Sequence, residues 1–287
     1  MITIFQSIIL GLIQGVTELF PISSLGHSVI LPTIFGWNIH QNDDFFLTFL
    51  VATHFATALV LLGFFWKDWV NVVKGLWRVL TSGKVPQGDT YARLGILLVV
   101  GTIPAAILGL ALEKPLRTLF ASPISAAIFL IFNAAVLYLA ERLRQGAPKA
   151  DEEGSDARLA KKLTTGSAFG IGVAQALALI PGFSRSGSSM AGGLLAGLTN
   201  EDAARFSFLL ATPVIGGAAL LKLPELFKAS NHDLRAPAFF GALAAAIAAY
   251  FAIRFLMRYF ETKRLTPFAL YCFIAGVSFA LILIGIQ

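Results

Sequence analysis

Long apolar runs alternate with shorter polar loops along this chain. Six of the runs are about as long as the ~17–25 residues that a bilayer-spanning helix needs. With 56% hydrophobic and 13% charged residues, the 287-residue chain also has too little polar material to cover a soluble globule. We therefore predict an all-α polytopic membrane protein. The predicted spans are Phe45–Trp66, Leu94–Leu112, Pro123–Ala140, Phe206–Leu223, Pro237–Ile253 and Pro267–Gln287.

Two further apolar segments, residues 1–36 and 163–200, are interrupted by glycine and proline. In hydrocarbon, irregular backbone is tolerated only where it is buried in protein or lines a wet cavity. We expect both segments to be re-entrant, entering and leaving the membrane on one face. The polar stretch 144–162 between them has the composition of a linker.

The two halves of the chain resemble each other in sequence. Gly11-Leu-Ile-Gln14 recurs as Gly172-Val-Ala-Gln175, Phe49-Leu-Val-Ala-Thr53 as Phe208-Leu-Leu-Ala-Thr212, and Ser122-Pro123 as Thr266-Pro267. Matches in the same order predict an internal duplication, with repeats at 1–143 and 163–287. A re-entrant segment followed by three spans makes such repeats inverted, and paired broken segments point to a binding site.

Basic residues predict the orientation in the membrane. The loops after the first, third and fifth spans carry 15 Lys or Arg, against five after the second and fourth when Lys222 is included. The positive-inside rule places the first set in the cytoplasm, so the chain would begin and end outside. A pI near 9.6 could suggest nucleic acid, but these charges flank apolar spans, and we expect no nucleic-acid partner.

The start of the chain lacks the basic region of a cleavable signal peptide, so we expect the first apolar segment to stay in the mature protein. A single cysteine, Cys272, excludes intramolecular disulfides and cysteine-rich metal sites.

Each interrupted segment contains one formal charge. Glu18 is the only Asp, Glu, Lys or Arg within residues 1–42, and Arg185 is the only one within 163–200. A charge at the centre of a membrane helix costs about 2.5–3.5 kcal/mol, and such residues usually face a polar cavity or a partner. Both charges therefore indicate a buried functional site.

The residues around Glu18 suggest catalysis. Gln14 lies four residues earlier, on the same helix face, and both side chains offer oxygen to a hard cation. After Pro21, the spacing of Ser24 and His27 brings a hydroxyl beside an imidazole, as in a nucleophile and its base. The alternative is that one of the adjacent serines caps a short helix and His27 packs inside.

The segment around Arg185 is suited to an anion. Its glycines permit conformations that turn N–H groups toward one point, and its serines add hydroxyls. The arginine fork matches phosphate oxygens, and a helix starting near Ser188 or Ser189 would add its N-terminal amides. The alternative is a helix break with Arg185 reaching lipid head groups. The pocket candidates are Gly182, Ser184, Ser186, Gly187 and Ser189.

A nucleophile, a base, an arginine clamp and an acid-amide pair are what phosphoryl transfer needs. A site inside a membrane protein implies a lipid substrate. Moving a lipid tail from the bilayer into water would cost about 0.8 kcal/mol per CH₂, so the enzyme must meet such a substrate in the membrane. The alternative is an inverted-repeat transporter or flippase of a phosphorylated lipid, which needs an anion clamp but no Ser24 and His27 pair. We interpret His54, in an apolar span, as an interior residue.

The motifs resemble those of undecaprenyl-pyrophosphate phosphatases of the bacitracin-resistance type. The matching residues are Gln14-x-x-x-Glu18, Pro21-x-Ser23-Ser24-x-Gly26-His27 and Pro181-Gly-Phe-Ser-Arg-Ser-Gly187, and the resemblance covers nearly the whole chain. It implies hydrolysis of undecaprenyl pyrophosphate, which recycles the carrier lipid for cell-wall synthesis in the bacterial inner membrane. It also implies a divalent cation, Mg²⁺ or Ca²⁺, and we expect the site to open to the periplasmic face.

The resemblance further implies that Glu18 and His27 are catalytic, that Ser24 is the nucleophile and that Arg185 binds pyrophosphate. Direct attack by water is the other mechanism. Many relatives have glutamate where this chain has Gln14, so one negative charge is missing from the expected metal pair, Glu18 and Gln14. The sequence leaves the oligomeric state open, a homodimer being one alternative. The residues assigned to the substrate pocket are Ser23, Gly182, Ser184, Ser186, Gly187 and Ser189.

Overall fold

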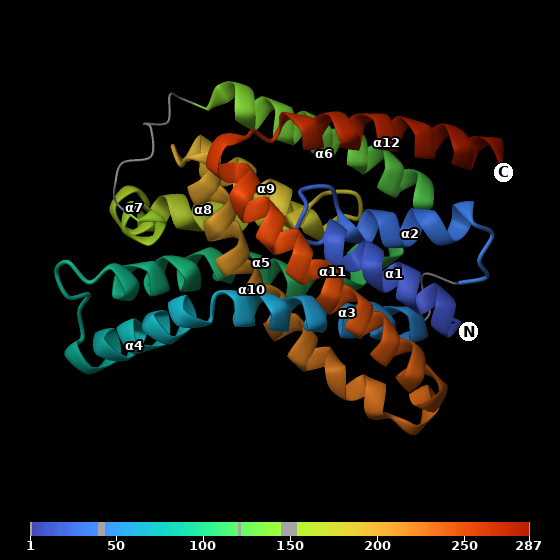
Figure 1. Cartoon of the computed structure of the whole chain (residues 1–287), viewed down its shortest axis with the longest axis horizontal. Helices are drawn as coiled ribbons and strands as arrows, with labels where there is room; N and C mark the ends of the chain where they lie inside the picture. Colours follow the sequence, from blue (N-terminus) through green and yellow to red (C-terminus); the bar gives the residue numbers. More distant parts are fainter. Residues whose placement is uncertain (1, 40–43, 120–121, 145–153, 287) are drawn as a thin grey trace.

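The computed structural model describes residues 2–39, 44–119, 122–144 and 154–286. The described chain is built from helices, and six of them are long and apolar enough to cross a membrane (Figure 1). These spans are Phe45–Phe64, Thr90–Leu112, Pro123–Leu143, Asn200–Phe227, His232–Thr262 and Thr266–Gly285. Each coincides with a predicted apolar run, so the prediction of an all-α, multi-pass membrane protein is confirmed.

The helices are α1 (Ile4–Thr17), α2 (Ser24–Ile34), α3 (Asp44–Phe64), α4 (Trp66–Ser82), α5 (Thr90–Leu119), α6 (Pro123–Leu143), α7 (Ser155–Lys162), α8 (Thr165–Gln175), α9 (Arg185–Leu195), α10 (Asn200–Lys222), α11 (Arg235–Thr262) and α12 (Thr266–Gly285). Short 3₁₀ turns lie at η1 (Ala176–Leu179), η2 (Leu223–Phe227) and η3 (Ala229–Leu234).

Helix boundaries differ from the apolar runs where a polar cap extends the helix. The fourth span begins at Asn200, six residues before the predicted Phe206. The Thr199 hydroxyl accepts the backbone N–H of Asp202 at 3.0 Å, which satisfies a donor of the first turn. A polar first turn is therefore part of the helix although hydropathy excludes it.

Two helical hairpins lie among the spans. Figure 1 shows α1 and α2 at the end of the molecule where both termini lie, whereas α8 and α9 approach from the end that carries α4 and α7. The α1–α2 loop and the loop before α9 meet near the middle of the molecule. These hairpins correspond to the segments predicted to be re-entrant.

The two halves pack against each other reciprocally. Helix α1 lies against α11, α8 against α5, α3 against α10, and α6 against α12. Glycines permit this proximity, because a Cβ on Gly11 would lie 2.1 Å from the Gly241 carbonyl oxygen, and one on Gly172 would lie 2.3 Å from that of Gly101. Each hairpin therefore rests on the middle span of the other half.

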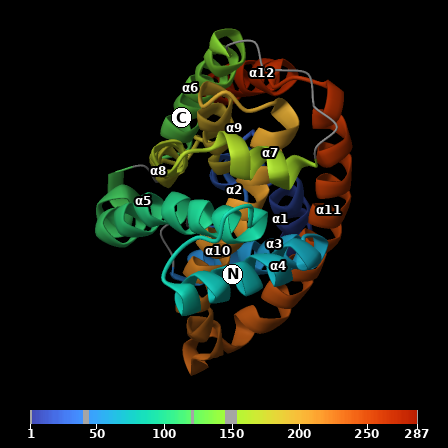
Figure 2. The same cartoon turned by 90° about the vertical axis from the view of Figure 1, so that its left-hand side faces the viewer.

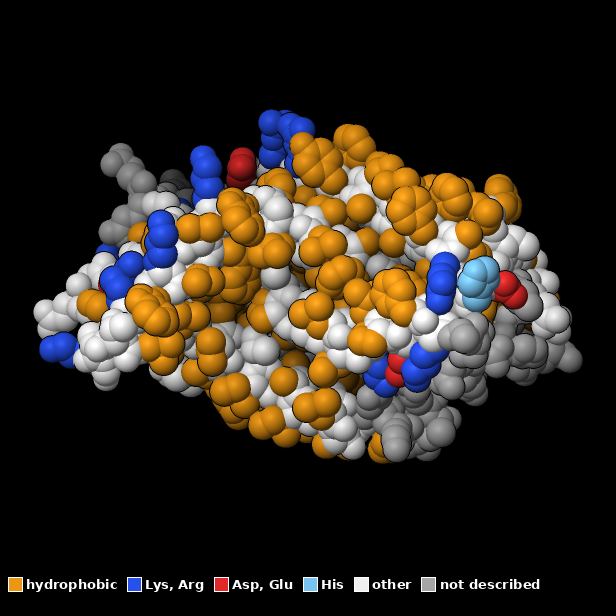
Figure 3. Space-filling view, turned by 90° about the horizontal axis from the view of Figure 1, so that it is seen from below, with side chains coloured by type: hydrophobic (Ala, Val, Ile, Leu, Met, Phe, Trp, Pro, Cys, Tyr) orange, Lys and Arg blue, Asp and Glu red, His pale blue; other side chains and the backbone are white. Residues whose placement is uncertain are grey.

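The outer surface is apolar where lipid would cover it. Helix α12, for example, exposes Leu270, Ile274 and Leu281, each by more than half. Figure 3 shows hydrophobic side chains over much of the face that it presents, with charged side chains gathered toward the edges. This distribution reverses that of a soluble protein and suits helices whose backbone groups are satisfied internally.

The end of the predicted linker is a docked helix. Helix α7 lies against α5 and α10 (Figure 2). Its Arg158 is only 5% exposed and pairs with Asp202 at 2.8 Å and Glu201 at 2.9 Å. Polar composition alone gave no sign of this helix, because the charges that suggested a linker are paired across the interface.

Candidate active site

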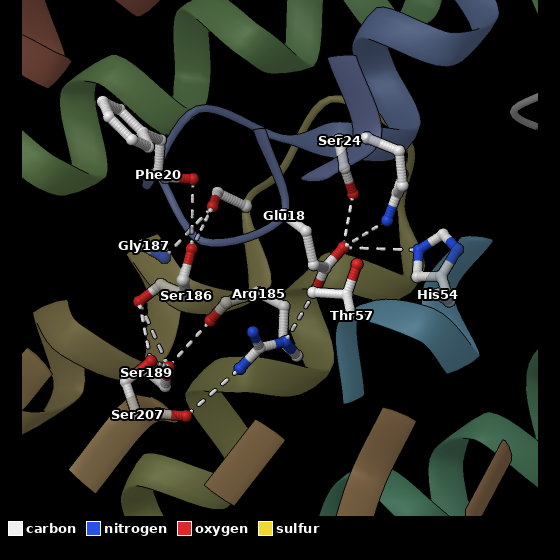
Figure 4. Close-up of polar contacts among 12 residues, drawn as sticks. Glu18, Phe20, Ser24, His54, Thr57, Arg185, Ser186, Gly187, Ser189 and Ser207 are labelled. Carbon is white, nitrogen blue, oxygen red and sulfur yellow. Dashed lines mark hydrogen bonds and ion pairs between the residues drawn. The ribbon is translucent and has the colours of Figure 1, made fainter. Parts of the chain in front are cut away.

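The lone carboxylate and the lone guanidinium of the two interrupted segments meet. Arg185 Nε donates to Glu18 Oε1 at 3.2 Å, although 167 residues separate them (Figure 4). The Glu18 side chain is 6% exposed and that of Arg185 is 10% exposed. Each charge compensates the other in a buried setting, where an unpaired charge would be costly. The alternative in which Arg185 reaches toward lipid head groups is therefore wrong.

Three further groups contact the second oxygen of Glu18. The Ser24 hydroxyl donates to Oε2 at 2.6 Å, and the Gln14 amide Nε2 donates to it at 3.2 Å. His54 Nε2, from α3, lies 3.3 Å from the same oxygen. The carboxylate is thus fixed by side chains from α1, the start of α2, α3 and α9.

Both hairpins use the same capping arrangement. The Ser23 hydroxyl accepts the N–H of Gly26 at 3.1 Å, and the Ser184 hydroxyl accepts the N–H of Gly187 at 3.1 Å. Ser24 and Arg185 are consequently the first residues of α2 and α9. The prediction of a helix starting near Ser188 was wrong by about one turn, because Ser184 already caps it. Ser23 is the capping serine, which leaves the Ser24 hydroxyl for Glu18.

Hydrogen bonds hold the two loops together. The buried Asn133 of α6 donates from Nδ2 to the Pro21 carbonyl at 3.1 Å and accepts the Ser184 N–H at 3.0 Å. The Ser186 hydroxyl donates to the Phe20 carbonyl at 3.2 Å. The site is therefore assembled by direct contact between the halves.

Two backbone conformations shape the loops. Gly182 has φ +104°, and a Cβ there would lie 2.4 Å from the Ala126 carbonyl oxygen, so both the dihedral angle and the space require glycine. Ser23 has φ +68°, and among the described residues it is the one with positive φ that is not a glycine. Such strain persists only where the surroundings enforce it, and it often accompanies function.

The remaining pocket candidates mostly serve the loop itself. Ser184 and Ser186 place their hydroxyl oxygens 3.1 Å apart, and the Gly187 N–H is taken by the cap. Ser189 lies on the side of α9 that faces α10, with its hydroxyl 2.6 Å from that of Ser207 (Figure 4). The structure does not bring Ser189 to Glu18.

Arg185 retains free binding capacity. Its Nη1 donates to the Ser207 carbonyl at 3.3 Å, but Nη2 is buried and has no hydrogen-bond partner among the described residues. A buried donor without a partner is costly unless a ligand satisfies it. Ser24 and Arg185 also begin α2 and α9, and the N-terminal end of a helix favours an anion.

His27 does not contact Ser24, contrary to the predicted pairing. Its Nδ1 lies 2.7 Å from the Ser23 carbonyl and its Nε2 lies 2.8 Å from the Tyr271 hydroxyl. Because a carbonyl oxygen only accepts, Nδ1 carries a proton and donates, and in the neutral ring Nε2 accepts from the Tyr271 hydroxyl. The pairing fails because the Ser24 hydroxyl turns toward the end of α1.

His27 and Tyr271 are polar residues on the wall of a largely apolar groove of about 640 Å³. The groove runs between α1, α2 and α12, next to the residues that flank Glu18. Its apolar lining includes Ile13, Val16, Phe20, Leu31 and Phe268.

Sequence reasoning missed three residues that organise this site: His54, Asn133 and Tyr271. All three are polar side chains inside predicted spans, outside the interrupted segments that contain the lone charges. His54 directly follows the repeated Phe49–Thr53 motif, and this position was a usable signal.

Two oxygen donors could serve a hard cation. Gln14 Oε1 is buried without a hydrogen-bond partner in the described part of the chain, and the nitrogen of the same amide contacts the Glu18 carboxylate. The described residues contain no cluster of three or more His, Cys, Asp or Glu that could hold a metal. One carboxylate and one amide oxygen nevertheless suit Mg²⁺ that takes its other ligands from substrate phosphates and water.

Comparison with known proteins identifies the family. A family model described as "Bacitracin resistance protein BacA" matches residues 7–278. Proteins named undecaprenyl-diphosphatase from Mycobacterium avium and Granulibacter bethesdensis are 46% and 45% identical, and the alignments cover 94–95% of this chain and 94% of each relative. An undecaprenyl-diphosphatase 2 from Frankia alni is 42% identical over 96% of both chains. The chain that brings Glu18 and Arg185 together therefore belongs to the bacitracin resistance protein BacA family.

Proposed function

We propose that this protein is a membrane phosphatase that hydrolyses undecaprenyl pyrophosphate to undecaprenyl phosphate and inorganic phosphate. The observation that carries the proposal is the buried Glu18–Arg185 pair with the Ser24 hydroxyl 2.6 Å from the carboxylate. The names of relatives that match over nearly the whole chain support the same substrate. The product is the carrier lipid in the form that cell-wall synthesis uses again.

In this proposal, Arg185 binds the diphosphate. Its free Nη2 donor binds a phosphate oxygen, and the N-terminal amides of α2 and α9 favour the same negative charge. The lipid tail stays in the bilayer. The fixed donors stabilise charge on the equatorial oxygens, which is the main requirement of phosphoryl transfer.

Ser24 attacks the terminal phosphorus. Its Oγ forms the new bond to phosphorus while its proton passes to Glu18 Oε2, its hydrogen-bond acceptor. The bond from that phosphorus to the bridging oxygen breaks, and undecaprenyl phosphate leaves with the electron pair. Water then attacks the phosphoserine, the bond between phosphorus and Ser24 Oγ breaks, and Glu18 returns its proton to Oγ as phosphate leaves. Glu18 replaces His27 as the proposed base.

His27 has a supporting role in this scheme. Its Nδ1–H donates to the Ser23 carbonyl and so stabilises the strained residue that directly precedes Ser24. Direct attack by a water that Glu18 activates is the competing mechanism. A phosphoserine trapped at Ser24 by acid quenching would support the serine mechanism, and its absence during turnover would favour water.

We also propose that Mg²⁺ or Ca²⁺ binds together with the substrate. Glu18 and the Gln14 amide oxygen would hold it, and the cation would offset the negative charge of the diphosphate. Gln14 is neutral, so this chain offers one negative charge fewer than a glutamate would supply. We therefore expect tight metal binding to require the substrate.

We place the protein in the bacterial inner membrane with the site open to the periplasmic face, on the strength of the basic loops after the first, third and fifth spans. A homodimer is a separate proposal that a mass measurement in detergent tests.

Phosphate release from a polyprenyl pyrophosphate by purified protein, with and without a chelator, tests the function. We expect release that stops in the chelator and returns with Mg²⁺ or Ca²⁺. No release under any condition would contradict the proposed function. Release that continues in the chelator would contradict only the requirement for a divalent cation.

Arg185→Ala should abolish phosphate release, because the diphosphate loses its clamp. Arg185→Lys keeps the charge but not the fork and should retain a small part of the activity. Size-exclusion profiles in detergent show whether each variant is folded. Wild-type activity in folded Arg185→Ala would show that Arg185 is not needed to bind the diphosphate.

A further inference from the structure

His54 lies on a different element from the rest of the site. Figure 4 shows its ring on α3, facing the carboxylate of Glu18 from the side opposite the α1–α2 loop. Nδ1 lies 2.7 Å from the Leu50 carbonyl oxygen, and Nε2 lies 3.3 Å from Glu18 Oε2. Carbonyl and carboxylate oxygens only accept, so both ring nitrogens donate and the ring is an imidazolium cation in this arrangement.

We propose that His54 is a positioning residue of this active site, whose Nε2–H group holds the Glu18 carboxylate in the orientation that accepts the Ser24 proton. This inference rests on the proposed phosphatase function. It concerns the histidine as a hydrogen-bond donor of fixed direction, because the bond to Leu50 sets the plane of its ring.

The distribution of contacts on Glu18 shows why such a residue is needed. Arg185 holds Oε1, whereas Ser24, Gln14 and His54 all approach Oε2. When a diphosphate engages Arg185, the guanidinium is shared between the substrate and Glu18. The hold on Oε1 then weakens, and the orientation of the carboxylate depends on the donors at Oε2.

Among those donors, His54 has the most rigid support. Gln14 lies on α1 and reaches Glu18 through a flexible side chain, and Ser24 is the group that reacts. The histidine comes from a long span and is anchored within its own helix by Leu50. A group placed on a rigid element holds a catalytic residue more accurately than one on a loop.

An ordinary interior histidine would differ in one respect. The Leu50 carbonyl alone would satisfy such a residue, and its second nitrogen could face any polar neighbour. Here the second nitrogen points at the carboxylate that contacts both Ser24 and Arg185 (Figure 4). The Nε2–H group of His54 therefore points in a direction that packing alone does not require.

The test compares His54→Leu, His54→Gln and His54→Asn in the purified full-length protein. We expect kcat of His54→Leu to fall about 10- to 100-fold, the loss of one hydrogen bond to a charged group. KM, and the Kd of a non-hydrolysable methylene-bisphosphonate lipid, should change less than about twofold, since Arg185 binding is intact. His54→Gln should recover part of kcat because its amide N–H reaches a similar distance but carries no charge, whereas the shorter His54→Asn should recover none.

His232 provides a matched control, since the same three substitutions at this exposed histidine should leave kcat unchanged. Wild-type kcat in His54→Leu, or equal kcat in the Gln and Asn variants, would overturn the inference. If His54→Leu does not fold, the comparison of Gln with Asn decides. If the wild-type protein itself releases no phosphate, the proposed function fails instead.

Discussion

Adjacent residues in this site have separate tasks. Ser23 adopts a positive φ and caps α2, so that Ser24 becomes the first helical residue and its hydroxyl meets Glu18. Arg185 holds the same position after the capping Ser184 in the other hairpin. The proposed nucleophile and the proposed clamp are therefore equivalent residues of two short helices.

Substitutions of Ser23 and Ser24 should have different effects on activity and on stability. Ser24→Ala removes the nucleophile and should abolish phosphate release with little effect on stability. Ser23→Ala removes a helix cap and should cost about 1 kcal/mol of unfolding free energy while leaving measurable activity. Thermal unfolding in detergent and phosphate release measure both quantities, and full activity in Ser24→Ala would exclude the serine mechanism.

The pairing of Glu18 with Arg185 could be expected from the sequence, because an isolated charge in an apolar segment needs a partner or a polar cavity in lipid. The predicted pairing of Ser24 with His27 was wrong because spacing does not define where a helix starts or which way its first residue points. His54 and Tyr271 were missed for a related reason. Their partners come from distant elements, and no local pattern distinguishes them from satisfied interior residues.

At the scale of elements, helix α6 connects the two loops. Asn133 reaches Pro21 on one side and Ser184 on the other, so a single amide of one span keeps both hairpins in register. Apolar periodicity predicted this span correctly. It could not predict the bridge, because the loops that meet Asn133 come from opposite halves of the chain.

Asn133→Ala should destabilise the protein and reduce activity together. It leaves the buried Ser184 N–H without its acceptor, at a cost of about 1–3 kcal/mol, and it leaves the Pro21 carbonyl with only the weak Cys272 thiol donor at 3.7 Å. Thermal unfolding and phosphate release would report the effect. Thr102→Val, which removes a hydroxyl bonded within α5, is a control that should stay within about 0.5 kcal/mol of wild type. An Asn133→Ala protein with wild-type stability would show that the bridge is dispensable.

At the scale of the whole molecule, buried and partly buried ion pairs fasten the segment between the halves. Arg158 of α7 pairs with Asp202 and Glu201 at the start of α10, and Arg205 pairs with Asp68 of α4 and Asp156 of α7. The amphipathic helix α4 and the end of the linker are thereby tied to the fourth span. Hydropathy predicted the spans but not these attachments, which depend on charge partners far apart in sequence.

Arg158→Ala should lower the stability of the protein by about 3–5 kcal/mol, because it leaves the fully buried Asp202 without its main partner. Arg78→Ala breaks an ion pair with Asp89 on the exposed surface and should change stability little. Thermal unfolding of both variants in the same detergent makes the comparison. A similar shift in both would show that burial does not set the strength of the α7 pair.

The reciprocal packing of the hairpins also affects how activity arises during synthesis. Glu18 emerges early from the ribosome, but its hairpin rests on α11, and its arginine partner arrives with α9. A nascent chain that stops before those helices has half of a reaction centre and no support for it. The membrane therefore gains a working enzyme only near the end of translation, and prematurely terminated chains should be inert toward the carrier lipid.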